Sequence, residues 1–188
     1  MPLILLRHLR PSVPEGVCYG ATDLEQAPGQ AAALAAILER LPPLDAIVTS
    51  PSRRCRVLAG AIGVARGLPA APDPRLAEMD FGSWEGQRWD ALPRAELDAW
   101  AGNFMHACPH GGETVAMLRA RTQAALRDHL AAGGVRLLVT HAGVIKAALA
   151  CGDHAGDWPE AIPFGESIAI CRTPHATDMP ASPRNDTR

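Results

Sequence analysis

The segment LILLRHLRPS, residues 3–12, begins with four apolar residues and then changes abruptly to arginine and histidine. A short, unbroken apolar run is typical of a strand that is buried on both faces of a parallel sheet. We therefore predict a strand over residues 3–6, with Arg7 and His8 at its carboxyl end. Ligands bind outside the carboxyl ends of strands in open α/β sheets, so Arg7 and His8 are candidate ligand-binding residues.

Other apolar runs repeat this pattern along the chain. Strands are predicted over residues 44–49, 135–140 and 167–172. Helices are predicted over residues 30–41, 50–65, 89–100, 113–131 and 143–150. The second of these helices is expected to take Ser50 as its N-cap and Pro51 as its first residue. Strands that alternate with helices in this way predict a largely parallel central sheet covered on both faces, which is a three-layer α/β/α sandwich.

The remaining segments are predicted to be connections. Residues 10–28 and 67–74 are rich in proline together with glycine or alanine, which favours loops. Residues 76–86, LAEMDFGSWEG, show little periodicity, and such a loop within a domain often carries function. Residues 173–188 are rich in Pro, Ser and charge, so we expect a single domain over residues 1–172 and a disordered C-terminal tail.

Length and charge limit the classes of function. With 188 residues, 47% of them hydrophobic, one domain with a sizeable core is expected. The net charge of −2 provides no basic field for nucleic acid. Residues 2–6 are too few for a signal peptide or a membrane-spanning helix. The cysteines lack a CxxC pair and favour a reduced, cytoplasmic setting (Cys18, Cys55, Cys108, Cys151 and Cys171).

Cationic or potentially cationic side chains follow three of the predicted strands. Arg7 and His8 follow the first, Arg53 and Arg54 lie one helical turn after the second, and His141 follows the third, with Lys146 farther along. A lone histidine or arginine at any of these places would be read as structural. Their conjunction in a chain of negative net charge predicts a pocket for a dianion, because the planar fork of arginine suits phosphate oxygens.

Five blocks of this sequence resemble the histidine phosphatase superfamily, in the branch that includes the cofactor-dependent phosphoglycerate mutases. The blocks occur in the family's order and are LLRH (5–8), SPSRRCRVLA (50–59), LAEMDFGSWEG (76–86), PHGGET (109–114) and VTHAGVIKAAL (139–149). The resemblance implies a phosphoglycerate mutase-like fold. It also implies an enzyme, a histidine acid phosphatase-type phosphoric monoester hydrolase without a metal or other cofactor.

The resemblance implies a role for each matching residue. His8 would be the nucleophile that takes the phosphoryl group, for which imidazole is suited because it can be neutral near pH 7. Arg7 and Arg54 would bind the phosphoryl oxygens, and His141 would contact the transferring group. Glu78 would be the general acid and would then deprotonate the attacking water. By the same resemblance, Arg53 matches a variable position and Glu85 is read as structural.

The sequence departs from the family beside the nucleophile. The family often reads R-H-G-x-[ST]-x-x-N, and here its glycine, hydroxyl and asparagine positions are Leu9, Pro11 and Pro14. Two side-chain phosphate donors are therefore missing. Ser12 and Arg10 are the candidates to replace them.

The next segment, VPEGVCYGATD (13–23), resembles the α-ribazole phosphatase subgroup, whose members remove a 5'-phosphate from a nucleotide precursor during cobalamin assembly. This resemblance implies that Tyr19 and Gly20 line the substrate side of the pocket. Mutases usually carry a longer chain with an insertion after the acid block. The expected function is thus hydrolysis of a small phosphorylated metabolite, α-ribazole 5'-phosphate first, by a monomer or homodimer that binds neither nucleic acid nor membrane.

Other functions stay open at this point. The chain could be a broad-specificity small-molecule phosphatase, a mutase-type phosphotransferase, or a phospho-ligand-binding protein that has lost catalysis. A metalloenzyme is also conceivable, because residues 106–110 (HACPH) and 151–154 (CGDH) contain ligand-type side chains. Neither segment has a structural-zinc pattern, so no metal is expected.

Overall fold

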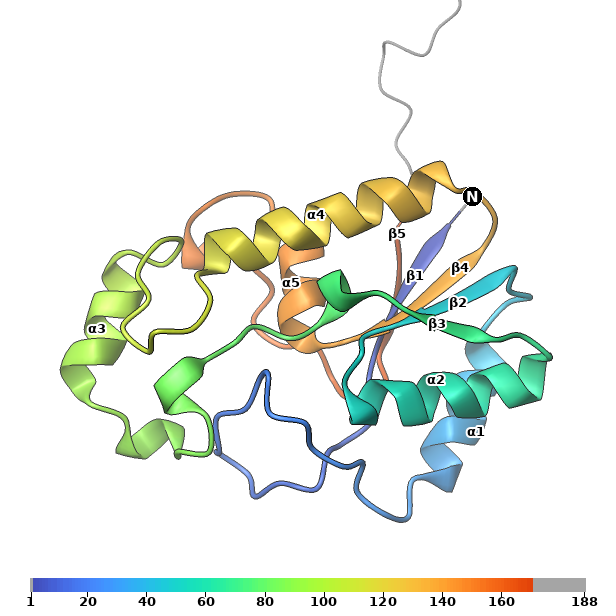
Figure 1. Cartoon of the computed structure of the whole chain (residues 1–188), viewed down its shortest axis with the longest axis horizontal. Coiled ribbons are helices and arrows are strands. Elements are labelled where there is room, and N and C mark those ends of the chain that lie inside the picture. The colour runs from blue at the N-terminus through green and yellow to red at the C-terminus, as the bar shows by residue number, and fades with distance from the viewer. Residues whose placement is uncertain (1, 171–188) are drawn as a thin grey trace, which may run out of the picture.

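The computed structural model describes residues 2–170, and within them five strands form one sheet in the order β3-β2-β4-β1-β5 (Figure 1). The parallel strands are β1 (Leu3–Arg7), β2 (Ala46–Thr49), β3 (Ala70–Pro72) and β4 (Arg136–Thr140). The edge strand β5 (Ser167–Ile170) runs antiparallel to β1. The predicted strands are confirmed within this range. The tail predicted over residues 173–188 lies outside the described residues.

Helices cover both faces of the sheet (Figure 1). Helices α1 (Ala31–Arg40) and α2 (Arg53–Arg66) lie on one face, and α4 (Val115–Ala131) and α5 (Ala142–Leu149) lie on the other. Helix α3 (Arg94–Gly102) lies beyond the end of α4, away from the sheet. The three-layer α/β/α architecture predicted from the sequence is thus confirmed.

The apolar run in β1 is unbroken because both of its faces are buried. Side chains alternate between the two faces of a strand. Leu3 and Leu5 accordingly join the core beneath α4 and α5, whereas Ile4 and Leu6 join the core beneath α1 and α2. At about 1.5–3 kcal/mol for each fully buried Leu or Ile side chain, this one strand contributes substantially to the stability of both cores.

The prediction of a helix over residues 89–100 is wrong for the residues before Arg94. The chain forms a single 3₁₀ turn over Trp89–Ala91, and α3 begins only at Arg94. Pro93 lies between the two pieces and explains the break, because proline has no N–H to donate and keeps the preceding residue extended. Leu92 is indeed extended, with φ −69° and ψ 145°.

The predicted start of α2 is also wrong. The helix begins at Arg53, with Ser52 at the N-cap position rather than Ser50. The hydroxyl of Ser50 lies instead 2.8 Å from His141 Nε2. The first N–H of the helix, that of Arg53, donates to Asp23 Oδ1 at 2.6 Å, so a carboxylate from a distant loop satisfies this helix end.

The segment 67–74 was predicted to be a connection, but it contains β3. This three-residue strand lies at the edge of the sheet, where Pro72 pairs with Thr49. Proline is tolerated there because an edge strand has a side that needs no ladder hydrogen bond. The loop predicted over residues 10–28 is confirmed, with only isolated bridges at Pro11 and Val17.

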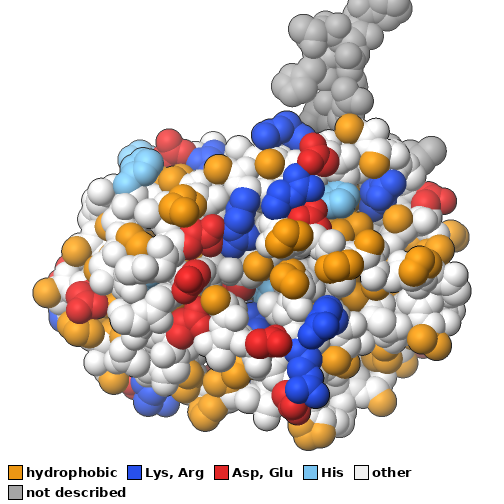
Figure 2. Space-filling model, viewed as in Figure 1, with side chains coloured by type: hydrophobic (Ala, Val, Ile, Leu, Met, Phe, Trp, Pro, Cys, Tyr) orange, Lys and Arg blue, Asp and Glu red, His pale blue; other side chains and the backbone are white. Residues whose placement is uncertain are grey.

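Further 3₁₀ turns lie at Pro74–Leu76, Gly82–Trp84 and Ala155–Asp157. None of the helices in the described part of the chain has the length and apolar character needed to cross a membrane. On the face shown in Figure 2, acidic and basic side chains are interspersed rather than gathered into one basic field. Cys18, Cys55, Cys108 and Cys151 carry free thiols, and the cytoplasmic setting stays a prediction.

Candidate active site

The parallel pairing of β1 with β4 brings two histidines together. Arg7 is in register with Thr140, so the residue that follows each of them, His8 and His141, leaves the sheet at the same edge. The backbone N–H of His8 donates to the Thr140 carbonyl at 2.9 Å. The two imidazole rings lie edge to face, with centroids 5.0 Å apart.

His8 is almost completely buried, and its surroundings determine where its proton sits. Nδ1 lies 2.6 Å from the Leu9 carbonyl oxygen, which can only accept a hydrogen bond. The proton is therefore on Nδ1, and Nε2 keeps its lone pair. Burial, outweighing the hydrogen bond to Leu9, lowers the pKa of His8 to about 3, with Arg54 and Arg7 adding to the effect. His8 is thus a neutral base near pH 7.

Arg54 and His141 form a fully buried pair behind His8. The Arg54 guanidinium donates to the carbonyls of Gly20 at 2.7 Å and Thr22 at 2.8 Å, and it lies 3.3 Å from His141 Nδ1. Arginine only donates, so Nδ1 of His141 accepts, and Nε2 carries the proton that Ser50 Oγ receives. Burial, with lesser contributions from His8 and the arginines, lowers the pKa of His141 well below its usual value.

Arg7 is held on the other side of His8. Its guanidinium carbon lies 3.7 Å from the centroid of the Phe164 ring, a cation–π distance, and it donates to the Ile162 carbonyl. The same ring lies 5.6 Å from the His8 ring. Burial lowers the pKa of Arg7, although Tyr19 and Glu78 nearby oppose this.

Two arginine N–H groups in this region have no hydrogen-bond partner among residues 2–170. Within the described residues, the Nε atoms of Arg7 and Arg54 are buried and lack a hydrogen-bond acceptor. A buried donor without a partner costs about 1–3 kcal/mol, more when it is charged. Such donors beside a neutral histidine are the arrangement expected of a site that binds an anion.

Glu78 lies in the loop between β3 and α3, where it reaches the N-terminus of α5. Its Oε2 accepts from the Gly143 N–H at 3.0 Å and its Oε1 accepts from the Met79 N–H at 2.9 Å. A Cβ atom at Gly143 would lie 2.1 Å from Glu78 Oε1. The glycine after His141-Ala142 therefore leaves the space that the carboxylate occupies.

A cavity of about 360 Å³ opens over these groups. Its walls come from the ends of β1 and α5 and from three loops, and its lining residues are Arg7, His8, Val17, Tyr19, Glu78, Trp89, Ala142, Lys146, Glu160, Ala161 and Ile162. Arg54 and His141 lie behind this lining rather than in it. The structure thus brings together all five residues to which the sequence assigned a catalytic role.

The predicted substrate-side residues are placed differently from one another. Tyr19 lines the cavity, and burial raises the pKa of its hydroxyl although Arg7 and Arg54 oppose the shift. Gly20 does not line it. It is buried against Met79, whose carbonyl oxygen a Cβ at Gly20 would approach to 1.8 Å, so its contribution is the carbonyl that Arg54 binds.

Ser12 is exposed and lies outside the cavity, with its backbone N–H bound to the Glu25 carbonyl at 2.8 Å. It therefore does not replace the family's missing donors in this conformation. Leu9, at the family's glycine position, is buried in the core beneath α1 and α2. Arg10 lies 5.2 Å from the Phe164 centroid, near Arg7, and so is the better placed of the two candidates.

Glu85 has the structural role expected of it. Its carboxylate accepts hydrogen bonds from the backbone of Ala21, Thr22 and Phe81, and from the Thr22 hydroxyl. Burial opposes its charge, but these hydrogen bonds outweigh burial and lower the pKa of Glu85. It joins the loop that carries Tyr19 to the loop that carries Glu78.

Sequence reasoning missed the wall formed by residues 160–164. Phe164 packs against Arg7 and His8, and the carbonyls of Glu160 and Ile162 receive Lys146 and Arg7. Backbone carbonyls leave no sequence signal, and a phenylalanine in a loop has no pattern that marks it. Lys146 was noted only for its charge, and its position on the cavity wall follows from its place on α5.

Metal ligation is not favoured by the segments considered for it. Among the described residues, no three His, Cys, Asp or Glu side chains are grouped closely enough to hold a metal ion. His110 instead accepts from the Gly112 N–H at 3.1 Å and packs 4.8 Å from the Trp84 ring, and Asp153 pairs with Arg119.

Helices cover both faces of the sheet, and a neutral histidine lies at one of its strand ends. Near it are two arginine donors that lack an acceptor among the described residues. This arrangement defines an anion-binding site that contains a nucleophile. Comparison with known proteins identifies the family. The model of the histidine phosphatase superfamily (branch 1) matches residues 3–161, and the chain belongs to that superfamily. Its members are phosphatases or mutases, so one of these two activities is supported for this chain.

Individual relatives are more distant. The adenosylcobalamin/alpha-ribazole phosphatase of Salmonella typhimurium is 29% identical over 131 residues, which are 67% of this chain. The match spans 64% of that enzyme's own length.

Solved structures agree with the fold. TTHB049 from Thermus thermophilus is 27% identical with a TM-score of 0.71, covering 92% of this chain and 94% of that one. The mycobacterial glucosyl-3-phosphoglycerate phosphatase is 31% identical with a TM-score of 0.66, covering 78% and 76%. A phosphoglycerate mutase from Thermus thermophilus is 28% identical with a TM-score of 0.70, covering 90% and 92%.

Proposed function

We propose that this protein is a phosphatase that hydrolyses small phosphomonoesters through a phosphohistidine at His8. The observation that carries the proposal is a neutral, buried His8 close enough to the charges of Arg7 and Arg54 for them to lower its pKa, while the Nε–H groups of these arginines lack an acceptor among residues 2–170. An approaching phosphoryl group would meet His8 and Arg7 at the cavity wall, with the Arg54 charge fixed behind them. No metal ion is required, because the arginines meet the charge on the phosphoryl oxygens.

In the first step, the Nε2 lone pair of His8 forms a bond to phosphorus while the ester P–O bond breaks. The departing oxygen takes a proton from Glu78. In the second step, Glu78 accepts a proton from a water molecule whose oxygen attacks phosphorus. The P–N bond breaks, inorganic phosphate leaves, and both His8 and Glu78 return to their initial states.

His141 takes part in this proposal as a neutral neighbour of His8. Its Nε2–H, which donates to Ser50, is the group that would turn to a phosphoryl oxygen, while Arg54 holds Nδ1. A neutral imidazole at this place leaves Arg7 and Arg54 as the cations of the site.

For the substrate, we propose α-ribazole 5'-phosphate. Support comes from the segment 13–23, from the identity to the Salmonella enzyme, and from the position of Tyr19 on the cavity wall. A broader phosphatase, or a mutase like the similar Thermus structure, is the alternative.

The test is phosphate release in EDTA from α-ribazole 5'-phosphate, 3-phosphoglycerate, sugar phosphates, nucleotides and p-nitrophenyl phosphate. A strong preference for the first supports the specific proposal. Similar, weak release from all of them supports the phosphatase and contradicts the substrate. Interconversion of 3- and 2-phosphoglycerate without release of phosphate would establish the mutase instead.

A further inference from the structure

A second and larger cavity, of about 490 Å³, adjoins the cavity over His8. Four residues line both cavities, namely Glu78, Ala142, Lys146 and Glu160. The two cavities therefore meet at these residues, which include the Glu78 carboxylate. A volume of this size falls in the range of small-molecule sites, which is about 300–1,000 Å³.

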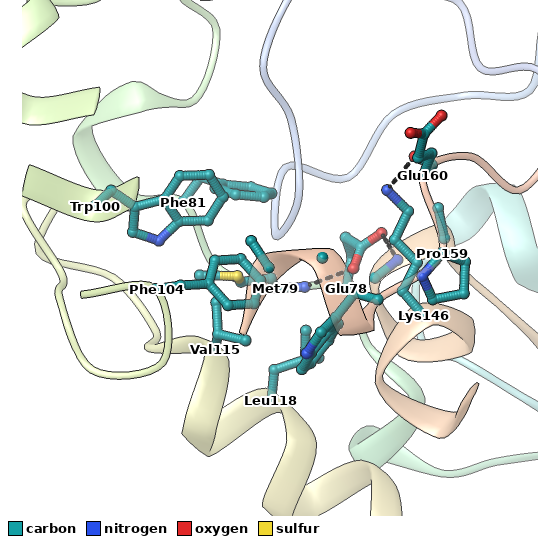
Figure 3. A pocket seen from close by; sticks show the side chains of 15 residues that line it. Glu78, Met79, Phe81, Trp100, Phe104, Val115, Leu118, Lys146, Pro159 and Glu160 are labelled. Carbon is teal, nitrogen blue, oxygen red and sulfur yellow. Dashed lines mark hydrogen bonds between the residues drawn. The ribbon is translucent and has the colours of Figure 1, made fainter. Parts of the chain in front are cut away.

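The walls of this second cavity are mainly apolar and aromatic (Figure 3). The aromatic lining residues are Phe81, Trp100, Phe104 and Trp158, and Met79, Val115 and Leu118 add aliphatic surface. In Figure 3 the rings of Phe81, Trp100 and Phe104 lie on one side, and Lys146, Pro159 and Glu160 lie on the other. The charged lining residues, Glu78, Lys146 and Glu160, all belong to the boundary with the first cavity.

The aromatic wall is preorganised. The Phe104 ring lies 5.4 Å from that of Trp158, nearly perpendicular to it, and 5.7 Å from that of Trp100. Trp158 is itself fixed, because its Nε1–H donates to the Gly152 carbonyl at 3.2 Å. Interlocked rings of this kind keep an apolar surface open for a ligand at a low cost in conformational entropy.

The boundary determines how a substrate would lie across the two cavities. On one side of the boundary, Lys146 Nζ donates to the Glu160 carbonyl at 2.8 Å. Glu78 stands at the other side, held by the N–H groups of Met79 and Gly143. A proton donor must lie next to the ester oxygen that it protonates. That oxygen therefore belongs at the boundary, with phosphorus on the His8 side and the alcohol group on the aromatic side.

We infer that the aromatic cavity is the leaving-group subsite, and that this protein prefers phosphate monoesters of alcohols that carry a planar aromatic ring system. The inference rests on the proposed phosphatase chemistry and adds the class of substrate to it. Sugar phosphates and glycerate esters that lack a ring system present mainly hydroxyls and carboxylates, for which this largely apolar wall offers few partners. A flat ring would bury its faces against Phe104 and Trp100.

The test compares 2-naphthylmethyl, benzyl and ethyl phosphate. All three are esters of primary alcohols that leave poorly, so differences in rate report chiefly on binding of the alcohol group. Burying an aromatic group of this size predicts kcat/KM for the naphthylmethyl ester about 10- to 100-fold above that for the ethyl ester, with the benzyl ester between them.

Variants locate the effect. Phe104→Ala is expected to lower the naphthylmethyl-to-ethyl ratio by about tenfold, and Phe104→Leu, which keeps apolar bulk, should lower it less. Met117→Ala, on an exposed side chain of the neighbouring helix α4, is the control that should leave the ratio unchanged. Because each variant is judged by a ratio, partial loss of folded protein does not alter the result.

Calorimetry of the binding of the matching non-hydrolysable phosphonates tests the subsite independently of turnover. Two outcomes would overturn the subsite but still support the phosphatase. One is turnover with no preference for the aromatic esters, and the other is a preference that Phe104→Ala does not change. Absence of turnover with all three esters and with α-ribazole 5'-phosphate would overturn the phosphatase. In that case, tighter binding of 2-naphthylmethylphosphonate than of ethylphosphonate would still support the subsite, and equal binding would overturn it too.

Discussion

The imidazole rings of His8 and His141 lie 5.0 Å apart at an interplanar angle of 67°, and both are buried. Their proximity follows from the register of β1 with β4, which places the first residue after each strand side by side. Burial disfavours the charged form of both rings, and a proton on either ring would also lie close to the charge of Arg54. Both histidines are therefore kept neutral in the folded protein.

This neutrality predicts how stability depends on pH. The unfolded chain takes up a proton at each histidine below about pH 6.5, whereas folded His8 does so only near pH 3. The unfolded state thus binds more protons between these values, so stability falls as pH falls. The expected slope is up to about 1.4 kcal/mol per pH unit for each histidine, measured by urea unfolding between pH 7 and pH 4. His8→Asn should reduce this slope, and a flat profile in the wild-type protein would contradict the account.

Glu78→Gln is expected to slow esters with poor leaving groups by about 10²–10⁴-fold, because the departing oxygen then lacks its proton donor. p-Nitrophenyl phosphate, whose leaving group needs little protonation, should lose much less. Steady-state kinetics on ethyl and p-nitrophenyl phosphate measures both losses. Glu39→Gln, at an exposed position of α1, is the control. Equal losses on the two esters would show that Glu78 is not the acid.

Gly143→Ala tests the placement of the same carboxylate. The added methyl group would fall 2.1 Å from Glu78 Oε1, and this flexible side chain would move aside. We expect the same leaving-group dependence as for Glu78→Gln, with thermal stability little changed.

Arg54 and Arg53 are adjacent in sequence, but we expect their substitution to affect stability and activity very differently. Arg54→Met leaves the carbonyls of Gly20 and Thr22 without their donor and should lower the free energy of unfolding by about 2–5 kcal/mol. It should also lower kcat/KM by about 10²-fold or more. The Arg53 guanidinium is exposed and pairs with an exposed Glu25, so Arg53→Met should change stability by less than about 1 kcal/mol. Denaturant unfolding and steady-state kinetics measure both variants. Similar losses of stability and of kcat/KM in the two variants would contradict this expectation.

Gly20→Ala should destabilise the protein by about 1–3 kcal/mol, because the new methyl group would collide with the Met79 carbonyl. Gly60→Ala is the matched control, since the space around this exposed glycine of α2 is open. There the same change should stabilise the helix by about 0.5–1 kcal/mol. Thermal unfolding of the two variants measures both changes in stability. If Gly20→Ala left the stability unchanged, the close packing of this loop against Met79 would be contradicted.

Strong local signals made the layers predictable from sequence. The apolar runs 3–6 and 135–140 are long enough to identify buried strands, and the residues after them, His8 and His141, share an edge in any parallel pairing. The errors lie where one residue overrides a pattern. Pro93 interrupts the helix predicted over residues 89–100, and Ser50 binds His141 instead of capping α2.

The site was predictable where a charged or titratable side chain lies at a strand end, as at Arg7 and His8. It was not predictable where function depends on space or on the backbone. Gly20 is buried outside the cavity lining and contributes a carbonyl, and Ser12 is exposed. The aromatic cavity is lined by residues distant in sequence, such as Phe104 and Trp158, so no local sequence pattern predicts it.

The central claim is that His8 carries the phosphoryl group. The most direct measurement is acid-free quenching of the protein during turnover of p-nitrophenyl phosphate in EDTA, followed by mass spectrometry of the peptide that contains residue 8. The account predicts a single added phosphoryl group on His8, lost on mild acid treatment, and no phosphoprotein and no turnover in His8→Ala. His106→Ala, at an exposed histidine outside the cavity, should behave as wild type. Substantial turnover by His8→Ala would contradict the mechanism.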